Sequence, residues 1–264
     1  MRLASHRFGS IPTDDRLRTL GYWPWHLVDG LGQRHRMGWI RPDLLTPSLC
    51  HDLRHDALQL AAMPDLSSRL QQSPAGEGWR NEQFVLRNEG GEPIVDQGGQ
   101  IVGLERSLFR PLGLFYITVQ LNLLTTDGRV WIAQRAQHKA VDPGLWDAAV
   151  AGGVAMGEDP LSALQRECWE EAGLPKASLD AMASLGSVLV QRALGPDQRQ
   201  GLQRELVMSY RLTAPSDWLP SNQDGEVQAF ECVSLEDIWR RWQSGQFNHE
   251  AAVGCLDFLA PQPD

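Results

Sequence analysis

The chain has 264 residues, of which 42% are hydrophobic and 22% are charged. These proportions are ordinary for a globular protein, and the length favours two modest domains over a single large one. The formal net charge of −9 argues against a basic surface that wraps nucleic acid or coats an anionic membrane. We therefore expect neither nucleic acid nor a membrane among the partners.

Cysteine usage and the absence of apolar segments indicate the compartment. The four cysteines lie far apart and form no Cys-x-x-Cys pair, which favours reduced thiols over a zinc site or a disulfide framework. The first 15 residues lack the apolar core of a signal peptide. No stretch approaches the roughly 20 apolar residues that span a bilayer. The sequence therefore predicts a cytoplasmic protein.

The first part of the chain alternates short apolar segments with glycine- and proline-rich breaks, which predicts a small α+β domain over residues 1–112. In chain order, the expected elements are a β-hairpin at 23–41, a helix at 43–72, strands at Gln83–Arg87 and Pro93–Val95, and a helix at Leu104–Arg110.

The second part, residues 113–264, mixes β-rich runs with amphipathic segments. In chain order, strands are expected at Tyr116–Thr125, Val130–Gln134, Leu185–Gln191, Glu205–Leu212 and Gln228–Val233, and helices at Pro160–Ala172, Leu235–Gln243 and Glu250–Leu259. A tight turn at Asp127-Gly128 joins the first two strands into a hairpin. Mixed strands followed by helices predict an α/β or α+β sandwich.

The helix at Pro160–Ala172 has clear start and stop signals. Asp159 can cap its free amides, Pro160 suits the first helical position, and Gly173 suits the C-terminal stop. At 100° per residue, one apolar stripe is expected to contain Leu161, Leu164, Cys168 and Ala172.

Three glutamates lie together beside this stripe. Glu167 faces Glu170 and Glu171 at the i+3 and i+4 spacings, where each like-charged pair costs about 0.2–0.5 kcal/mol. They also lie towards the helix C-terminus, which is unfavourable for anions. Charge on a helix is most often a solvated face. However, converging carboxylates are also the ligands that Mg²⁺ prefers, and a cation would turn their repulsion into attraction.

The same segment resembles the Nudix box, G-x5-E-x7-R-E-U-x-E-E-x-G-U, in which U is a bulky apolar residue. The matching residues are Gly152, Glu158, Arg166, Glu167, Cys168, Glu170, Glu171, Gly173 and Leu174. Cys168 is a mild departure at an apolar position. The resemblance implies an α/β/α Nudix sandwich with a mixed sheet, preceded here by the smaller domain.

For the site, the resemblance implies Mg²⁺-dependent cleavage of a diphosphate linkage, with Mn²⁺ as a substitute. Glu167, Glu170 and Glu171 resemble the metal ligands, together with the carbonyl of Gly152. Arg166 and Glu158 would brace the loop through ion pairs, and Gly173 would end the helix. The general base stays open between Glu170, Glu171 and the more distant Glu226.

Longer stretches resemble a Nudix subgroup with an extra N-terminal domain, related to the Nudix portion fused to thiamine pyrophosphokinase in some fungi. That resemblance implies oxo- and oxythiamine diphosphates as substrates, cleaved to the monophosphate. The first Nudix strand departs from the subgroup's His-x-Asn, because it reads Gln120-Leu-Asn122. Candidate substrate contacts are Arg135, Lys139, Asn122 and Gln120.

Other readings stay open at this point. The substrate could instead be a nucleotide diphosphate such as ADP-ribose or an oxidised nucleotide. Some Nudix relatives isomerise isopentenyl diphosphate with a reactive cysteine, and others only bind ligands and regulate. The sequence also leaves a homodimer open.

Overall fold

The computed structural model describes residues 2–3, 8, 12–45, 58–72, 79–139, 141–195, 201–214 and 218–260. The chain forms two compact units, and each is discontinuous in sequence. Unit 1 comprises Met1–Gly9, Ile117–Val190 and Leu206–Asp264, and unit 2 comprises Ser10–Tyr116 and Gln191–Glu205. A domain boundary between residues 112 and 113 stays a prediction.

An eight-stranded sheet runs through unit 1. Its strands are β1 (Arg2–Leu3), β7 (Phe115–Leu124), β8 (Val130–Arg135), β9 (Trp146–Ala148), β10 (Val150–Gly153), β11 (Ala183–Leu194), β12 (Gly201–Thr213) and β13 (Val227–Val233). The order is β1-β11-β12-β7-β8-β13, with β10 paired to β7 and β9 paired to β8. The sheet is mixed, because β1 runs parallel to β11 whereas β10, β8 and β13 pair antiparallel.

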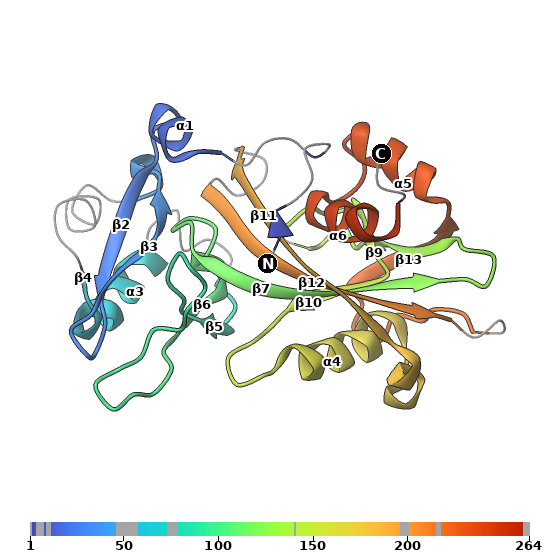
Figure 1. Ribbon diagram of the computed structural model, residues 1–264, viewed down its shortest axis with the longest axis horizontal. Coiled ribbons are helices and arrows are strands. Elements are labelled where there is room, and N and C mark those ends of the chain that lie inside the picture. Colours follow the sequence, from blue (N-terminus) through green and yellow to red (C-terminus); the bar gives the residue numbers. More distant parts are fainter. Residues whose placement is uncertain are drawn as a thin grey trace. The chain divides into compact units, whose positions relative to one another are not determined.

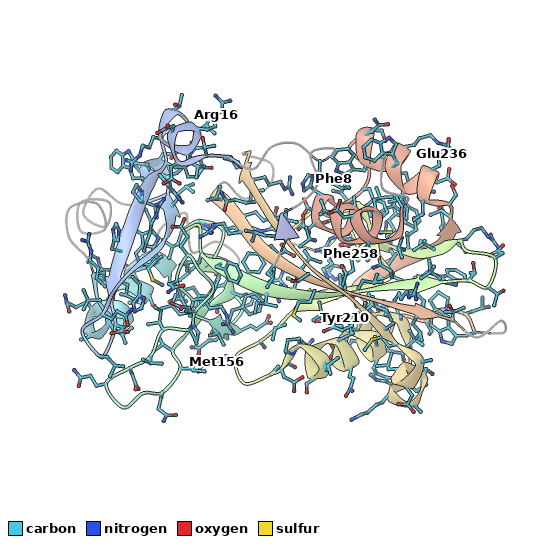
Figure 2. The ribbon with its side chains drawn as sticks, viewed as in Figure 1. Phe8, Arg16, Met156, Tyr210, Glu236 and Phe258 are labelled. Carbon is cyan, nitrogen blue, oxygen red and sulfur yellow. The ribbon has the colours of Figure 1, made fainter. Side chains whose placement is uncertain are left out.

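Helices cover both faces of this sheet. Figure 1 shows α4 (Pro160–Ala172) on one face and α5 (Leu235–Gln243) with α6 (His249–Leu259) on the other. Each face has its own apolar core, and Figure 2 labels Tyr210 in the α4 core and Phe258 against the α6 core. The expected α/β/α sandwich with a mixed sheet is confirmed. None of the helices in the described ranges is both long and apolar enough to cross a membrane.

Unit 2 contains short elements around a second core. These are α1 (Asp14–Thr19), β2 (Trp23–Val28), β3 (Arg34–Ile40), η2 (Pro42–Leu44), β4 (Leu58–Gln59), η3 (Leu60–Ala62), α3 (Met63–Gln71), β5 (Gln83–Val85), β6 (Gly103–Glu105) and η5 (Arg106–Leu108). The sheets are β3-β2-β4 and β5-β6. Trp25 is fully buried in this core, and its indole N–H donates to the carbonyl of Leu112 at 2.9 Å.

Two helix predictions in unit 2 are wrong. The segment expected as one helix over 43–72 instead holds β4, two 3₁₀ turns and the shorter α3, while residues 46–57 lie outside the described part. Pro64 explains the late start of α3, because proline fits the first turn of a helix but not its interior. The helix expected at Leu104–Arg110 is the end of β6 and the three-residue η5.

Three turns in unit 2 share one local design. They begin at Asp29, Asn88 and Asp96, and in each the side-chain Oδ1 accepts the amides two and four residues later. The fourth residue of each turn is a glycine with positive φ, at Gly32 (83°), Gly91 (90°) and Gly99 (77°). Glycine adopts this backbone without steric cost, so each turn is fixed by residues within the turn itself.

Candidate metal centre and active site

The helix α4 begins and ends at the predicted signals. The Oδ1 atom of Asp159 accepts the amides of Leu161 and Ser162 at 2.9 and 3.0 Å. Gly173 has φ 65°, and its amide donates to the carbonyl of Trp169 at 3.0 Å. These caps fix where the three glutamates fall on the helix.

The buried side of α4 differs from the predicted apolar stripe. Leu161, in the first turn, is 49% exposed. The buried residues are Ala163, Leu164, Cys168, Glu171 and Ala172. One carboxylate of the predicted metal set therefore lies inside the buried arc, because β10 packs over this part of the helix.

Glu171 is held by the backbone of β10. Its Oε2 accepts the amide of Ala151 at 2.9 Å, and its Oε1 lies 3.9 Å from the Lys139 ammonium. Burial raises the pKa of Glu171 well above its usual range, and the nearby Glu167 raises it further, whereas Lys139 lowers it. The buried Glu171 carboxylate therefore depends on nearby positive charge, which the Lys139 ammonium supplies.

Glu167 packs directly against Gly152. A Cβ atom added at Gly152 would lie 1.9 Å from Oε1 of Glu167, so only glycine leaves room for this carboxylate. Burial raises the pKa of Glu167 to about 7, and Arg166 acts in the opposite direction. Like Glu171, Glu167 is therefore a buried carboxyl group whose ionisation is unfavourable unless positive charge lies near it.

Arg166 contacts three acidic side chains. Its guanidinium donates to both carboxylate oxygens of Glu158 at 2.8 and 3.0 Å, to Glu167 at 2.7 Å and to Glu170 at 3.1 Å. It also donates to the carbonyl of Gly153 at 3.3 Å. The hydrogen bond from Arg166 lowers the pKa of Glu158. These contacts tie the loop before α4 to the helix.

Glu226 and Lys139 approach the same end of α4 from two loops. The Lys139 ammonium forms an ion pair with Glu226 and lies near Glu171. The loop before β13 is fastened to the helix, because the amide of Gln223 donates to the carbonyl of Glu170 at 2.8 Å. The structure therefore brings Glu226 beside the box.

Three candidate substrate contacts have other partners in the structure. Arg135 donates to Asp147 at 2.9 Å and to the carbonyl of Val141 at 2.9 and 3.2 Å. Gln120 and Asn122 are 2% and 1% exposed, and their amides donate to backbone carbonyls of α6 at 3.2 Å. These contacts are structural, and substrate binding by the three residues stays a prediction.

The side chains at the site fit a hard divalent cation in their chemistry. Within the described residues, no group of three or more His, Cys, Asp or Glu side chains is already arranged to hold a metal ion. Arg166 and Lys139 instead lie against the carboxylates of Glu167, Glu170 and Glu171. Buried carboxylates need such positive charge, and carboxylate oxygens are the donors that Mg²⁺ prefers.

Two features of the site were missed from the sequence. The amide of Ala151 holds Glu171, and the ammonium of Lys139 links Glu171 to Glu226. The small residues Ala151-Gly152-Gly153 carried a local signal, because a strand without bulky side chains admits a close neighbour. No local signal pairs Lys139 with Glu226, which lies 87 residues away.

Comparison with known proteins shows similarity over much of the sequence. The NUDIX domain model matches residues 117–252. Nudix hydrolase 20, chloroplastic, of Arabidopsis thaliana is 32% identical over 186 residues, or 69% of this chain and 47% of that protein. The chain spans about half the length of the plant relatives it matches.

An enzyme and a solved structure show further similarity to this chain. The isopentenyl-diphosphate Delta-isomerase of Leifsonia xyli is 31% identical over 140 residues, or 53% of this chain and 71% of that enzyme. The crystal structure of DR0079 from Deinococcus radiodurans has a TM-score of 0.49 and 23% identity, covering 66% of this chain and 97% of that one. Because the family model covers more than half of the sequence and its box lies on the capped helix α4, this chain belongs to the Nudix family.

Proposed function

We propose that this chain is a Mg²⁺-dependent hydrolase that cleaves a diphosphate linkage. The observation that carries the proposal is the contact of Glu167 with Gly152, beside the buried Glu171. The ionised carboxylates of this arrangement are buried, so they are stable only with positive charge beside them. The family membership and the plant relatives named Nudix hydrolase support the same activity.

In this proposal, each residue has a defined task. Glu167, Glu170 and Glu171 would hold Mg²⁺, and the ion would supply positive charge for the phosphate oxygens and a more acidic bound water. The Ala151 amide fixes the orientation of Glu171, and Gly152 leaves space for Glu167. Arg166 links the loop at Glu158 to the helix through its hydrogen bonds.

Glu226 is our candidate for the general base. It lies outside the box, its side chain is 38% exposed, and Lys139 holds it near Glu171. A base must reach a water and also exchange its proton with solvent, which a partly exposed carboxylate can do. Glu170, whose side chain is 39% exposed, is the alternative within the box, whereas the buried Glu171 has no such route.

The substrate proposed first is an oxidised thiamine diphosphate such as oxo- or oxythiamine diphosphate. Its support is the resemblance of the longer sequence stretches to the thiamine-related Nudix subgroup. A nucleotide diphosphate such as ADP-ribose, or an oxidised nucleotide, is the second candidate. Both classes present the same diphosphate to the box, so the carboxylates do not choose between them. A cytoplasmic location and a homodimer likewise stay predictions.

The similarity to isopentenyl-diphosphate isomerases favours one reaction of another class. In the resemblance stated above, that chemistry uses a reactive cysteine. Burial raises the pKa of Cys168 and of Cys255 to about 12, which keeps both as inert thiols at neutral pH. Cys232, on β13, is partly exposed, and Cys50 lies outside the described residues. Because the isomerases depart from the box and this box is intact, we propose hydrolysis ahead of isomerisation.

A diphosphate panel with Mg²⁺ tests the proposal. It should include oxythiamine, oxothiamine and unmodified thiamine diphosphates, ADP-ribose, oxidised nucleotides and isopentenyl diphosphate, with products identified by mass spectrometry. Glu170→Gln and Glu171→Gln should abolish turnover and keep the fold, whereas Glu236→Gln, on the exposed side of α5, should not change it. Normal turnover by both box variants would refute the mechanism. Tight binding without any cleavage would identify a regulatory protein instead.

A further inference from the structure

Lysine is rare in this chain and occurs beside the proposed metal centre. The sequence has two lysines, Lys139 and Lys176, among 24 basic Lys and Arg residues. Lys176, after α4, is exposed, whereas the side chain of Lys139 is only 10% exposed. Nearly every other position of positive charge is an arginine. The buried site thus has a compact ammonium rather than a planar guanidinium.

Three separate segments meet at the Lys139 ammonium. One is the loop after β8 that carries Lys139 itself, the second is α4 with Glu171, and the third is the loop before β13 with Glu226. The ammonium lies 3.9 Å from Oε1 of Glu171 and forms the ion pair with Glu226. A divalent cation bound to Glu171 would therefore lie close to the ammonium and repel it.

Backbone contacts fix this meeting point. The amide of Ala136 donates to the carbonyl of Glu226 at 2.9 Å, and the amide of Lys139 donates to the carbonyl of Ala136 at 3.1 Å. Arg135 donates hydrogen bonds to the carbonyl of Val141 at the far end of the same loop. The backbones of Lys139 and Glu226 are thus joined through Ala136, so the ammonium can leave Glu171 without separating the two loops.

We propose that Lys139 is a positioning residue that stands in for the divalent cation at Glu171 in the metal-free protein and exchanges with that cation on binding. The ammonium offsets the charge of the buried Glu171 carboxylate and holds Glu226 close to it. When a divalent cation takes Glu171, repulsion moves the ammonium away while the backbone contacts keep Glu226 in place. This inference rests on the proposed metal-dependent function.

The acetylation rates of the two lysines, compared in one sample, test the exchange. Acetylation by a limiting N-hydroxysuccinimide ester, followed by peptide mass spectrometry, gives the rates of Lys139 and Lys176 in the same sample. Without metal, we expect Lys139 to react at least tenfold more slowly than Lys176. With saturating Mg²⁺, the Lys139 rate should rise at least threefold while the Lys176 rate stays constant. Equal rates without metal would overturn the proposal.

Metal affinity gives a second readout that does not depend on turnover. Removing the competing charge in Lys139→Met should tighten Mn²⁺ binding, measured by electron paramagnetic resonance, at least threefold. Lys139→Arg keeps a cation and should stay within twofold of the parent, as should the matched control Lys176→Met. Unchanged or weaker binding in Lys139→Met would contradict the competition.

The two proposals fail in different ways. If the unaltered protein does not bind Mn²⁺, the proposed function falls and the exchange falls with it. If Mn²⁺ binds and lysine acetylation is the same with and without metal, the exchange alone is overturned. If Lys139→Met does not fold, the acetylation of the unaltered protein still decides the question.

Discussion

Gly152→Ala should separate metal binding from folding at this site. The added Cβ would lie 1.9 Å from Oε1 of Glu167, and real contacts of this kind stay above about 3.0 Å. The carboxylate must therefore withdraw by roughly 1 Å. The clashing atoms are Cγ, Cδ and Oε1 of a flexible side chain, and none of them belongs to the backbone, so the backbone of β10 need not move. Alanine within a strand even gains about 0.5–1 kcal/mol over glycine.

The expected outcome is a folded protein with a damaged site. A displacement of about 1 Å in a positioned group costs on the order of 100-fold in rate, so we expect kcat to fall by about that factor and Mn²⁺ to bind at least tenfold more weakly. The melting temperature of the metal-free protein should change little. Gly195→Ala is the matched control, because nothing lies within 4 Å of a Cβ there.

Three measurements decide this prediction together. They are hydrolysis of the best diphosphate from the panel, Mn²⁺ titration and thermal unfolding in EDTA. Glu167→Gln should show the same losses of kcat and of Mn²⁺ affinity as Gly152→Ala, since both take a carboxylate away from one position. Parental Mn²⁺ affinity and kcat in Gly152→Ala would refute the placement of Glu167 as a ligand. Global unfolding would instead refute the argument that the clash is confined to a side chain.

Three other perturbations follow from the same contacts. The folded, metal-free protein binds the Glu167 proton more tightly than the unfolded chain does. Raising the pH from 4.5 through 7 should therefore lower its free energy of unfolding by up to about 3 kcal/mol. Denaturant titrations in EDTA measure this change, and Glu167→Gln should remove that part of the pH dependence. Arg166→Lys loses the paired hydrogen bonds to Glu158 and should cost about 1 kcal/mol, with a double-mutant cycle against Glu158→Gln showing the coupling. Asn122→Ala removes a donor to the carbonyls of Tyr210 and Gly254 and the acceptor of the buried Gln120 amide, while Ser209 still donates to Gly254. The loss should cost about 1–3 kcal/mol in chemical denaturation, and an unaltered stability would contradict the structural role. The Mn²⁺ affinity of folded Asn122→Ala should stay within twofold of the parent.

Local signals explain why the helix α4 was predictable from the sequence. Asp159, Pro160 and Gly173 each act through backbone geometry within one turn of the helix, so their meaning does not depend on the rest of the fold. The alternation along β7 is similar, because it places Gln120 and Asn122 on the face opposite the apolar residues. What covers that face was not visible, and α6 turns out to bind both amides.

Tertiary packing explains what the sequence did not reveal. Glu171 falls within the buried arc of α4 because β10 lies over it, and a helical wheel carries no information about such a neighbour. The failed helix over 43–72 has a local reason, since Pro64 limits where α3 can begin. The approach of Lys139 to Glu226 depends on two loops that come together only when the sheet has formed.

The divided course of unit 2 has a consequence for synthesis on the ribosome. Residues 10–116 leave the exit tunnel first, but the unit also needs residues 191–205, including Gly201, whose carbonyl accepts the Tyr22 hydroxyl at 2.6 Å. At about 5–20 residues per second, the intervening stretch takes several seconds to translate. During that interval, the Tyr22 hydroxyl lacks the Gly201 carbonyl as its acceptor, because that residue has not yet been synthesised. Slowing translation between residues 116 and 191 should therefore lengthen the time for which the nascent chain is open to proteases and chaperones.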